Sequence, residues 1–263
     1  MIRVCVAGIT GWTGRPLARA IAAADDLELV AGVARSAAGR PLAELVDGAG
    51  GQVYGSVAEA LDAVQVDVLV DYTSAEAVKA NVLAALEREV AVVVGSSGLS
   101  ADDFVEIERL ALEHQVGVVA AGNFSFLAAL LLRFAAEAAR HAPAWEIIDY
   151  ASAGKSDVPS GTSRELAERL GAVREPELGR PLAGLQGPVE ARGATVAGTQ
   201  IHSVRLPSFV VSTEIVFGAP GERLTIRHDP NESPEPYIAG TLIAVRAVRA
   251  RVGLTRGLDS LLD

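Results

Sequence analysis

A lysine and a hydroxyl-rich helix start stand close together near the middle of the sequence. Lys155 lies five residues before Ser160-Gly161-Thr162, and that triplet opens the helical pattern SGTSRELAERL. The first N–H groups of a helix have no partner within the helix, so they attract anions. Two hydroxyls and an ammonium group suit a carboxylate or phosphate. We therefore predict a site for a small anionic substrate at Lys155, Ser160, Gly161 and Thr162.

The plainer alternative for Lys155 is a surface ion pair. However, Lys155 is one of very few lysines, and the chain carries a formal charge of −10. An acidic protein that binds acidic ligands must concentrate positive charge locally, which favours the anion site. The same net charge argues against nucleic-acid binding, because that association depends on clustered Lys and Arg.

A second site is predicted in the glycine-rich turn near the N-terminus. The turn reads Gly8-Ile9-Thr10-Gly11-Trp12-Thr13-Gly14; it follows an apolar strand and opens a helix. Glycines let backbone N–H groups approach a pyrophosphate closely. The spacing GxxGxxG also fits a plain turn, but its strand–turn–helix setting favours a dinucleotide. We expect the cofactor to contact Gly8, Gly11, Trp12, Thr13 and Gly14.

The residue after the second predicted strand bears on the choice of cofactor. NAD sites usually place an acid here to accept from the ribose 2′-hydroxyl. This chain has Ala34 followed by Arg35, and an arginine without a competing acid favours a 2′-phosphate. We therefore predict NADPH rather than NADH, the alternative being that Arg35 is a solvated surface residue.

Two further turns follow strands of the same predicted sheet. They are Asp71-Tyr72-Thr73-Ser74 and Gly95-Ser96-Ser97-Gly98. Each could be an ordinary capped helix start. Because the carboxyl ends of parallel strands share one edge, we instead expect Thr73, Gly95, Ser96 and Ser97 to line the nicotinamide end of the cofactor.

The order of apolar runs and helical patterns predicts two domains. Through residue 122, Val-rich strands alternate with helices, which is typical of a parallel α/β sheet of Rossmann type. The predicted strands are Arg3–Ala7, Leu27–Val33, Val66–Asp71, Val90–Gly95 and Val116–Ala121. Residues 123–231 give helices followed by consecutive strands, typical of an α+β domain with a mostly antiparallel sheet. A C-terminal helix within 232–263 is expected to complete the first domain.

Several classes of protein are excluded by composition. No apolar run reaches the roughly 18 residues that a membrane-spanning helix needs. The N-terminus enters a strand without a charged-then-apolar leader, so we expect a cytoplasmic protein. The single cysteine, Cys5, excludes an internal disulfide. No spacing of His, Asp, Glu or Cys is typical of a metal site.

Taken in order, these motifs resemble the dihydrodipicolinate reductase family over nearly the whole chain. The most specific element is Lys155-x-Asp157-x-Pro159-Ser160-Gly161-Thr162. The other matching segments are residues 8–14, 71–73, 95–98, Ala121-Gly122-Asn123-Phe124-Ser125, Gly221-Glu222-Arg223-Leu224 and His228. The resemblance implies a homotetramer that reduces a cyclic carboxylated imine with NADPH or NADH. It places Lys155, Ser160, Gly161 and Thr162 on a substrate carboxylate, and adds Asn123 and Phe124 to the cofactor site.

The substrate half departs from the family pattern. Family members carry Glu-x-His-His, whose first histidine is taken as the proton donor, where this chain has Asp149-Tyr150-Ala151-Ser152. The proton must then come from Lys155, from Tyr150, from Asp149 through water, or from solvent, and His202 is a further candidate. A substrate that arrives as a protonated iminium would need no such donor.

Three hypotheses follow. The first is an NADPH-dependent reductase of this family, which acts either on the lysine-pathway intermediate or on a diverged carboxylated imine. The second is a non-catalytic nucleotide- or metabolite-binding paralogue, which the missing histidines favour. The third is another Rossmann enzyme, an amino-acid or sugar dehydrogenase. We predict Lys155 as the catalytic residue.

Overall fold

The chain folds around two separate sheets. The computed structural model describes residues 1–262. Unit 1 consists of Met1–Phe126 and Pro234–Asp263, and unit 2 of Leu127–Ser233. No helix in the described part of the chain is both long and apolar enough to cross a membrane.

The sheet of unit 1 is parallel throughout, in the order β12-β6-β5-β4-β1-β2-β3. Its central strands are short and almost wholly apolar, because helices cover both faces. This is the Rossmann-type sheet that the sequence predicts. The strands are β1 (Ile2–Ala7), β2 (Leu27–Val33), β3 (Gln52–Tyr54), β4 (Val68–Asp71), β5 (Ala91–Val94), β6 (Gly117–Ala120) and β12 (Gly253–Arg256).

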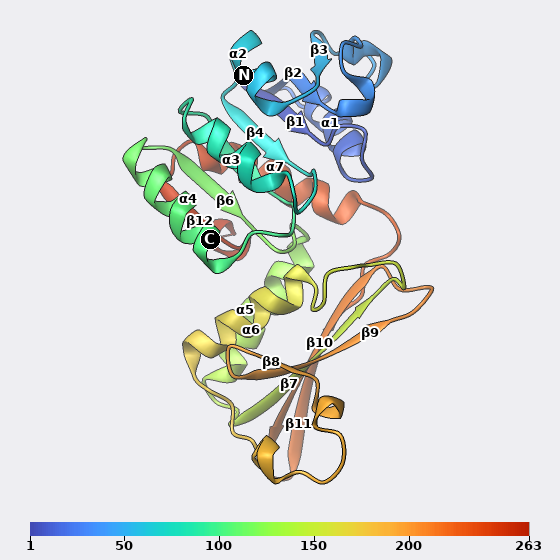
Figure 1. Ribbon diagram of the computed structural model, residues 1–263, viewed down its shortest axis with the longest axis vertical. Helices are drawn as coiled ribbons and strands as arrows, with labels where there is room; N and C mark the ends of the chain where they lie inside the picture. Colours follow the sequence, from blue (N-terminus) through green and yellow to red (C-terminus); the bar gives the residue numbers. More distant parts are fainter. Residues whose placement is uncertain (263) are drawn as a thin grey trace. The chain divides into compact units, whose positions relative to one another are not determined.

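The helices of unit 1 form two layers (Figure 1). Contacts run between α1 and α7 on one side and from α2 through α3 to α4 on the other. These helices are α1 (Gly14–Ala22), α2 (Val57–Ala63), α3 (Val78–Leu86), α4 (Ala101–Glu113) and α7 (Glu235–Val248). Strand order reverses beside β1, which lies between β2 and β4. Ligands of open α/β sheets bind at the carboxyl ends of strands at such a point.

The C-terminal segment is less helical than predicted for 232–263. Helix α7 ends at Val248, β12 follows, and a short 3-10 helix, η5 (Asp259–Leu261), comes last. Gly253, the first residue of β12, adopts a φ of +83°, and its N–H donates to Val116 O at 3.0 Å. The tail therefore contributes both a helix and an edge strand to unit 1.

The sheet of unit 2 is mixed, in the order β11-β10-β7-β9-β8. Only the β7–β9 pair is parallel, so the sheet is mostly antiparallel, as predicted. Its elements are α5 (Phe126–Ala139), β7 (Ala144–Ala151), α6 (Gly161–Val173), η3 (Leu182–Gly184), η4 (Val189–Arg192), β8 (Ala194–Val196), β9 (Thr199–Arg205), β10 (Val211–Ala219) and β11 (Glu222–His228).

One face of this sheet packs on α5 and α6, which lie together in Figure 1. Residues alternate between the faces of a strand, and β7 shows this in its alternating burial. Trp145 and Ile147 enter the core with Leu166 of α6. Asp149 continues the same row, so its carboxylate reaches the start of α6, whereas Glu146 and Tyr150 point from the opposite face.

Candidate functional site

The turn after β1 has a shape that only glycine allows. Gly8 has a φ of +81°, and a Cβ there would lie 2.1 Å from Tyr72 O. A Cβ on Gly14 would lie 2.1 Å from Gly8 O. Gly11 N–H donates to Gly8 O at 2.8 Å and closes the turn. The glycines therefore let this turn fold tightly against the turn that follows β4.

This turn leaves amide donors for an anion. Thr13 precedes the first residue of α1 without making a side-chain cap. Within residues 1–262, the N–H groups of Trp12, Thr13 and Gly14 donate to no carbonyl. Trp12 is 53% exposed, and its ring lies edge-on to Tyr237 at 5.8 Å. Free amides at a helix start fit the pyrophosphate of a dinucleotide.

Asp71 organises the two neighbouring turns, a role that no sequence motif indicates. This fully buried carboxylate accepts from Thr73 N–H at 3.0 Å, Thr73 Oγ1 at 2.7 Å and Ser96 Oγ at 2.6 Å. Asn81 Nδ2 donates to its other oxygen at 2.8 Å. Thr73 N–H also donates to Ser96 Oγ at 2.7 Å. Thr73 and Ser96, both predicted site residues, are thus held together at the sheet edge.

Aromatic side chains inside unit 1 pack against these two turns. A Cβ on Gly95 would lie 2.3 Å from the Tyr72 ring, and the Tyr72 hydroxyl lies 2.7 Å from Thr241 Oγ1. Phe124 is 1% exposed and packs edge-on to Tyr72. The Phe124 side chain therefore belongs to the core, and only its backbone is available to a ligand. Asn123 Oδ1 accepts from Ser125 N–H at 2.8 Å, while Ser97 is exposed.

Arg35 stands exposed directly after Ala34, at the start of η1 (Arg35–Ala37). The nearby Arg40 binds Glu44 at 2.6 Å. Arg35 makes no ion pair with any residue from 1 to 262, so its guanidinium is available to a ligand.

In unit 2, Ser160 binds a buried carboxylate of the same unit. Its N–H donates to Asp149 Oδ2 at 2.9 Å and its hydroxyl to Asp149 Oδ1 at 2.6 Å. Ser160 is 1% exposed, and its contact with a substrate carboxylate stays a prediction. The amides of Gly161 and Ser163 find no acceptor within residues 1–262, and the Ser160 side chain makes no cap. Thr162 is buried, whereas these two backbone amides are available to an anion.

Lys155 does form an ion pair, with a residue of its own motif. Its Nζ lies 2.6 Å from Asp157 Oδ1, and both side chains are about three-quarters buried. Lys155 N–H donates to Ser152 O at 3.0 Å and fixes the turn after β7. A second carboxylate must therefore share the ammonium group with Asp157, which three ammonium hydrogens allow.

Asp149 connects these segments to the neighbouring strands. Besides Ser160, its carboxylate accepts from Ser163 Oγ at 3.1 Å, Ser203 Oγ at 3.0 Å and Arg205 Nη2 at 2.8 Å. Burial opposes ionisation, but the hydrogen bonds from Ser160 and Arg205 outweigh it and hold the pKa of Asp149 below its usual value. Asp149 is therefore an ionised acceptor and a poor source of a proton.

Tyr150 and His202 lie on the other face of the sheet from Asp149. The Tyr150 hydroxyl donates to Glu214 Oε2 at 3.3 Å, and burial followed by the Glu214 charge raises its pKa. His202 Nε2 lies 2.7 Å from Glu146 Oε2. Neither side chain faces the start of α6. The segment 155–162 is called the anion turn below. Of the proton donors considered from the sequence, Lys155 is the one that belongs to it.

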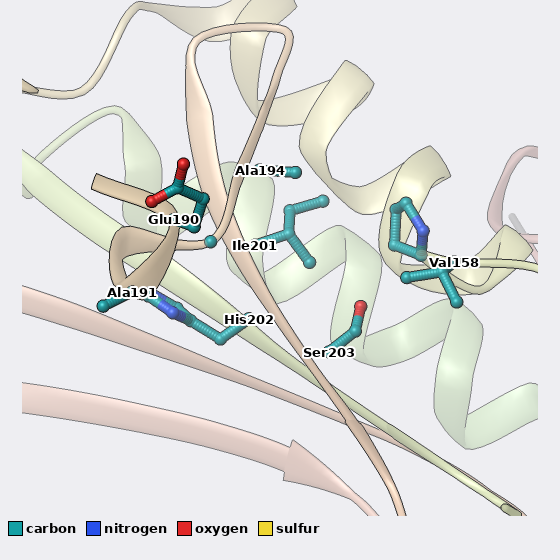
Figure 2. Close-up of a pocket in the computed structure, with 9 residues that line it drawn as sticks. Val158, Glu190, Ala191, Ala194, Ile201, His202 and Ser203 are labelled. Carbon is teal, nitrogen blue, oxygen red and sulfur yellow. The ribbon is translucent and has the colours of Figure 1, made fainter. Parts of the chain in front are cut away.

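A pocket of about 390 Å³ borders this turn (Figure 2). Val158 lies at one end and Ala191 at the other, and His202 runs from β9 toward Ala191. Lys155, Gly161 and Thr162 do not line it. The full lining is Val158, Pro159, Glu190, Ala191, Gly193, Ala194, Ile201, His202 and Ser203. In the described part of the chain no group of His, Cys, Asp and Glu could hold a metal ion.

Comparisons with known proteins match nearly the whole chain. Two family models cover the chain: dihydrodipicolinate reductase, N-terminus, over residues 2–124, and dihydrodipicolinate reductase, C-terminus, over residues 128–262. The 4-hydroxy-tetrahydrodipicolinate reductase of Moorella thermoacetica is 39% identical, covering 100% of this chain and 98% of that protein. That of Syntrophomonas wolfei is 37% identical, covering 99% and 98%.

A solved structure is similar over the same length. It is described as dipicolinate-bound dihydrodipicolinate reductase from Paenisporosarcina sp. TG-14. Its TM-score is 0.77 at 29% sequence identity, with 99% of each chain covered.

Proposed function

Since the chain belongs to the dihydrodipicolinate reductase family, we propose that it transfers a hydride from NADPH to a small carboxylated cyclic imine. It is a reductase of this family, and such reductases use a nicotinamide dinucleotide. The proposal adds the phosphorylated form of the cofactor, the substrate class and the residues that act.

The observation that carries the proposal is the start of α6. There the amides of Gly161 and Ser163 have no acceptor within residues 1–262, and Lys155 belongs to the same eight-residue motif. A helix N-terminus and a cation together favour a carboxylate. The similar structure from Paenisporosarcina contains dipicolinate, a planar dicarboxylate of the proposed size.

The glycine turn of unit 1 supports the cofactor assignment. Its tight backbone and the free amides of Thr13 and Gly14 fit a pyrophosphate. The turns held by Asp71 would place Thr73, Gly95 and Ser96 along the ribose and nicotinamide. When bound, the dihydronicotinamide supplies the hydride.

We assign the remaining steps to the anion turn of unit 2. The backbone from Gly161 to Ser163 and the Lys155 ammonium would hold a substrate carboxylate and so fix the ring. Loss of water from 4-hydroxy-tetrahydrodipicolinate would give a C=C bond conjugated with the imine, and the hydride would add to the far carbon of that conjugated system. Lys155 Nζ would give a proton to the imine nitrogen and take one back from solvent, and the enamine formed would tautomerise to tetrahydrodipicolinate. A substrate that arrives already protonated as an iminium would need only the contacts that hold its carboxylate.

We expect Arg35→Ala to weaken NADPH binding by about tenfold to 100-fold and to leave NADH binding nearly unchanged. The reason is the loss of one charge-assisted contact to the 2′-phosphate, worth about 1.5–3 kcal/mol. Calorimetric titration with both nucleotides measures this. Arg40→Ala is the matched control, because Arg40 already binds Glu44. Equal losses for NADPH and NADH in Arg35→Ala would remove the 2′-phosphate assignment.

Turnover tests the function as a whole. We expect loss of NADPH absorbance when the purified protein meets 4-hydroxy-tetrahydrodipicolinate, with the Moorella enzyme as a positive control. Tight NADPH binding without turnover on this or simpler cyclic imines would instead indicate a non-catalytic binding protein. Oxidation of an alcohol or amine with NADP would indicate another dehydrogenase.

The family resemblance also leads us to propose a homotetramer that works in the cytoplasm. Light scattering on the purified protein measures the assembly, and a monomeric mass would contradict that part of the proposal.

A further inference from the structure

We propose that Asp149 and Arg205 are positioning residues for the anion turn: together they fix the backbone between Lys155 and Thr162 and cancel each other's charge. This inference rests on the proposed function of that turn. It concerns two residues that touch neither the substrate carboxylate nor the cofactor.

The contacts of Asp149 reach the helix start from a distant strand. Asp149 lies on β7, is 0% exposed, and binds both donors of Ser160, the residue before α6. A serine in that position usually caps the helix by accepting from an amide two or three residues on. Here the Ser160 hydroxyl donates to Asp149 and caps no amide, so the Ser163 amide, like that of Gly161, has no acceptor within residues 1–262. The position of Asp149 thus determines both the place and the availability of the anion-binding amides.

Arg205 connects the other end of the turn to the same carboxylate. Its Nη2 donates to Asp149 Oδ2 and to the backbone oxygen of Asp157, each at 2.8 Å. Asp157 in turn binds Lys155 at 2.6 Å. One guanidinium therefore links the segment that carries the ammonium group to the segment that begins α6, and Asp149 is the anchor that they share.

The pair also solves an electrostatic problem. An ionised Asp149 at the start of α6 would repel a substrate carboxylate that binds the next amides. Arg205 places a positive charge at 2.8 Å from it, with side chains that are 15% and 0% exposed, so the pair is close to neutral. Charges in such a buried setting are weakly screened. The incoming anion then meets the helix start and Lys155 rather than an uncompensated carboxylate.

The opposite face of β7 offers a matched control. Glu146 lies three residues before Asp149 and also accepts from an arginine, Arg192, and from His202. Glu146→Gln and Arg192→Met therefore remove a carboxylate–arginine pair from the same strand without touching the α6 start. Both should leave ligand binding unchanged.

Binding of dipicolinate and of NADPH to the full chain tests the proposal. We expect Asp149→Asn and Arg205→Met to raise the dipicolinate Kd by about tenfold to 100-fold, the size of one lost charged hydrogen bond. The KM for the imine should rise with it, while the Kd for NADPH stays as in the wild type. Arg205→Met should have the larger effect, because it leaves the Asp149 charge uncompensated. Asp149→Glu, which keeps the carboxylate, should recover part of the affinity that Asp149→Asn loses.

Milder variants keep the test valid if Asp149→Asn does not fold. Arg205→Lys keeps the charge but loses the guanidinium that bonds both Asp149 Oδ2 and Asp157 O. Ser203→Ala removes one hydroxyl donor, which lies 3.0 Å from Asp149 Oδ2. Both should still weaken dipicolinate selectively over NADPH. Wild-type affinity in all these variants, or equal losses in Glu146→Gln, would overturn the positioning role while leaving the proposed function intact. Failure of the wild type itself to bind dipicolinate would overturn both.

Discussion

Replacing Lys155 with methionine is expected to lower kcat/KM for the imine by at least about 10³-fold. Loss of a charged contact to the substrate carboxylate accounts for about 1.5–3 kcal/mol. Loss of a positioned proton donor accounts for a further factor of roughly 10²–10⁴. Methionine preserves most of the volume of the side chain, which is only 24% exposed. Initial rates with NADPH, with each substrate varied in turn, measure the effect.

Two further variants separate the roles of Lys155. Lys155→Arg keeps the positive charge but is a poor proton donor, because a guanidinium holds its proton far more tightly than an ammonium group does. It should retain dipicolinate binding and still lose kcat. Full kcat in Lys155→Arg would show that the proton comes from solvent or arrives with an iminium substrate. Lys79→Met, which alters the only other lysine, a surface residue bound to Asp103 and Glu106, should behave as the wild type.

The second large effect is expected for Gly14→Ala, which should weaken NADPH binding at least about tenfold. The new Cβ would lie 2.1 Å from Gly8 O. Because both groups belong to the backbone, the turn must open, at a cost of about 1–3 kcal/mol for such overpacking. The same strain should lower the free energy of unfolding. Fluorescence titration with NADPH and thermal denaturation measure the two effects.

Gly50→Ala provides the comparison for this variant. Gly50 lies in the same unit, and a Cβ there would meet nothing within 4 Å. The Gly50→Ala variant should therefore bind NADPH as the wild type does. If Gly14→Ala lowered the melting temperature but left the NADPH Kd unchanged, the glycine turn would be a folding element and the cofactor site would lie elsewhere.

The central strands and the helices of unit 1 were predictable because local sequence patterns indicate them. Val-rich runs buried on both faces identify β1, β4, β5 and β6, and helical periods separate them. Strands β3 and β12 have no such local pattern. Each has only three or four residues. β12 forms by pairing with β6, which places Leu254 beside Val118, a residue far away in the sequence.

The site was predictable as a set of motifs but not as a set of contacts. The sequence places Lys155 and Gly161 in one segment, yet Asp149 and Arg205 are 56 positions apart and meet only because β7 and β9 are neighbours. The same limit applies to Ser160, because its two hydrogen bonds to Asp149 could not be read from the sequence. Strand alternation, by contrast, could have shown from the sequence that Tyr150 and Asp149 point to opposite faces.

The histidine pair expected from the family resemblance is absent from this chain. Within the structure, Asp149 is an ionised anchor, and Tyr150 and His202 face away from it. We therefore propose Lys155 as the side chain that both holds the anion and gives a proton. A reductase built this way would depend more on substrate binding and less on a dedicated acid.

Transfer of deuterium from NADPH that carries deuterium at both C4 positions of the nicotinamide tests the central claim most directly. The label should be incorporated into the tetrahydrodipicolinate product, as detected by mass spectrometry, when the wild-type protein acts on 4-hydroxy-tetrahydrodipicolinate. The Lys155→Met variant should form far less labelled product in the same time. NADPH oxidation that gives only unlabelled product, or no oxidation while the Moorella enzyme reacts alongside, would contradict it.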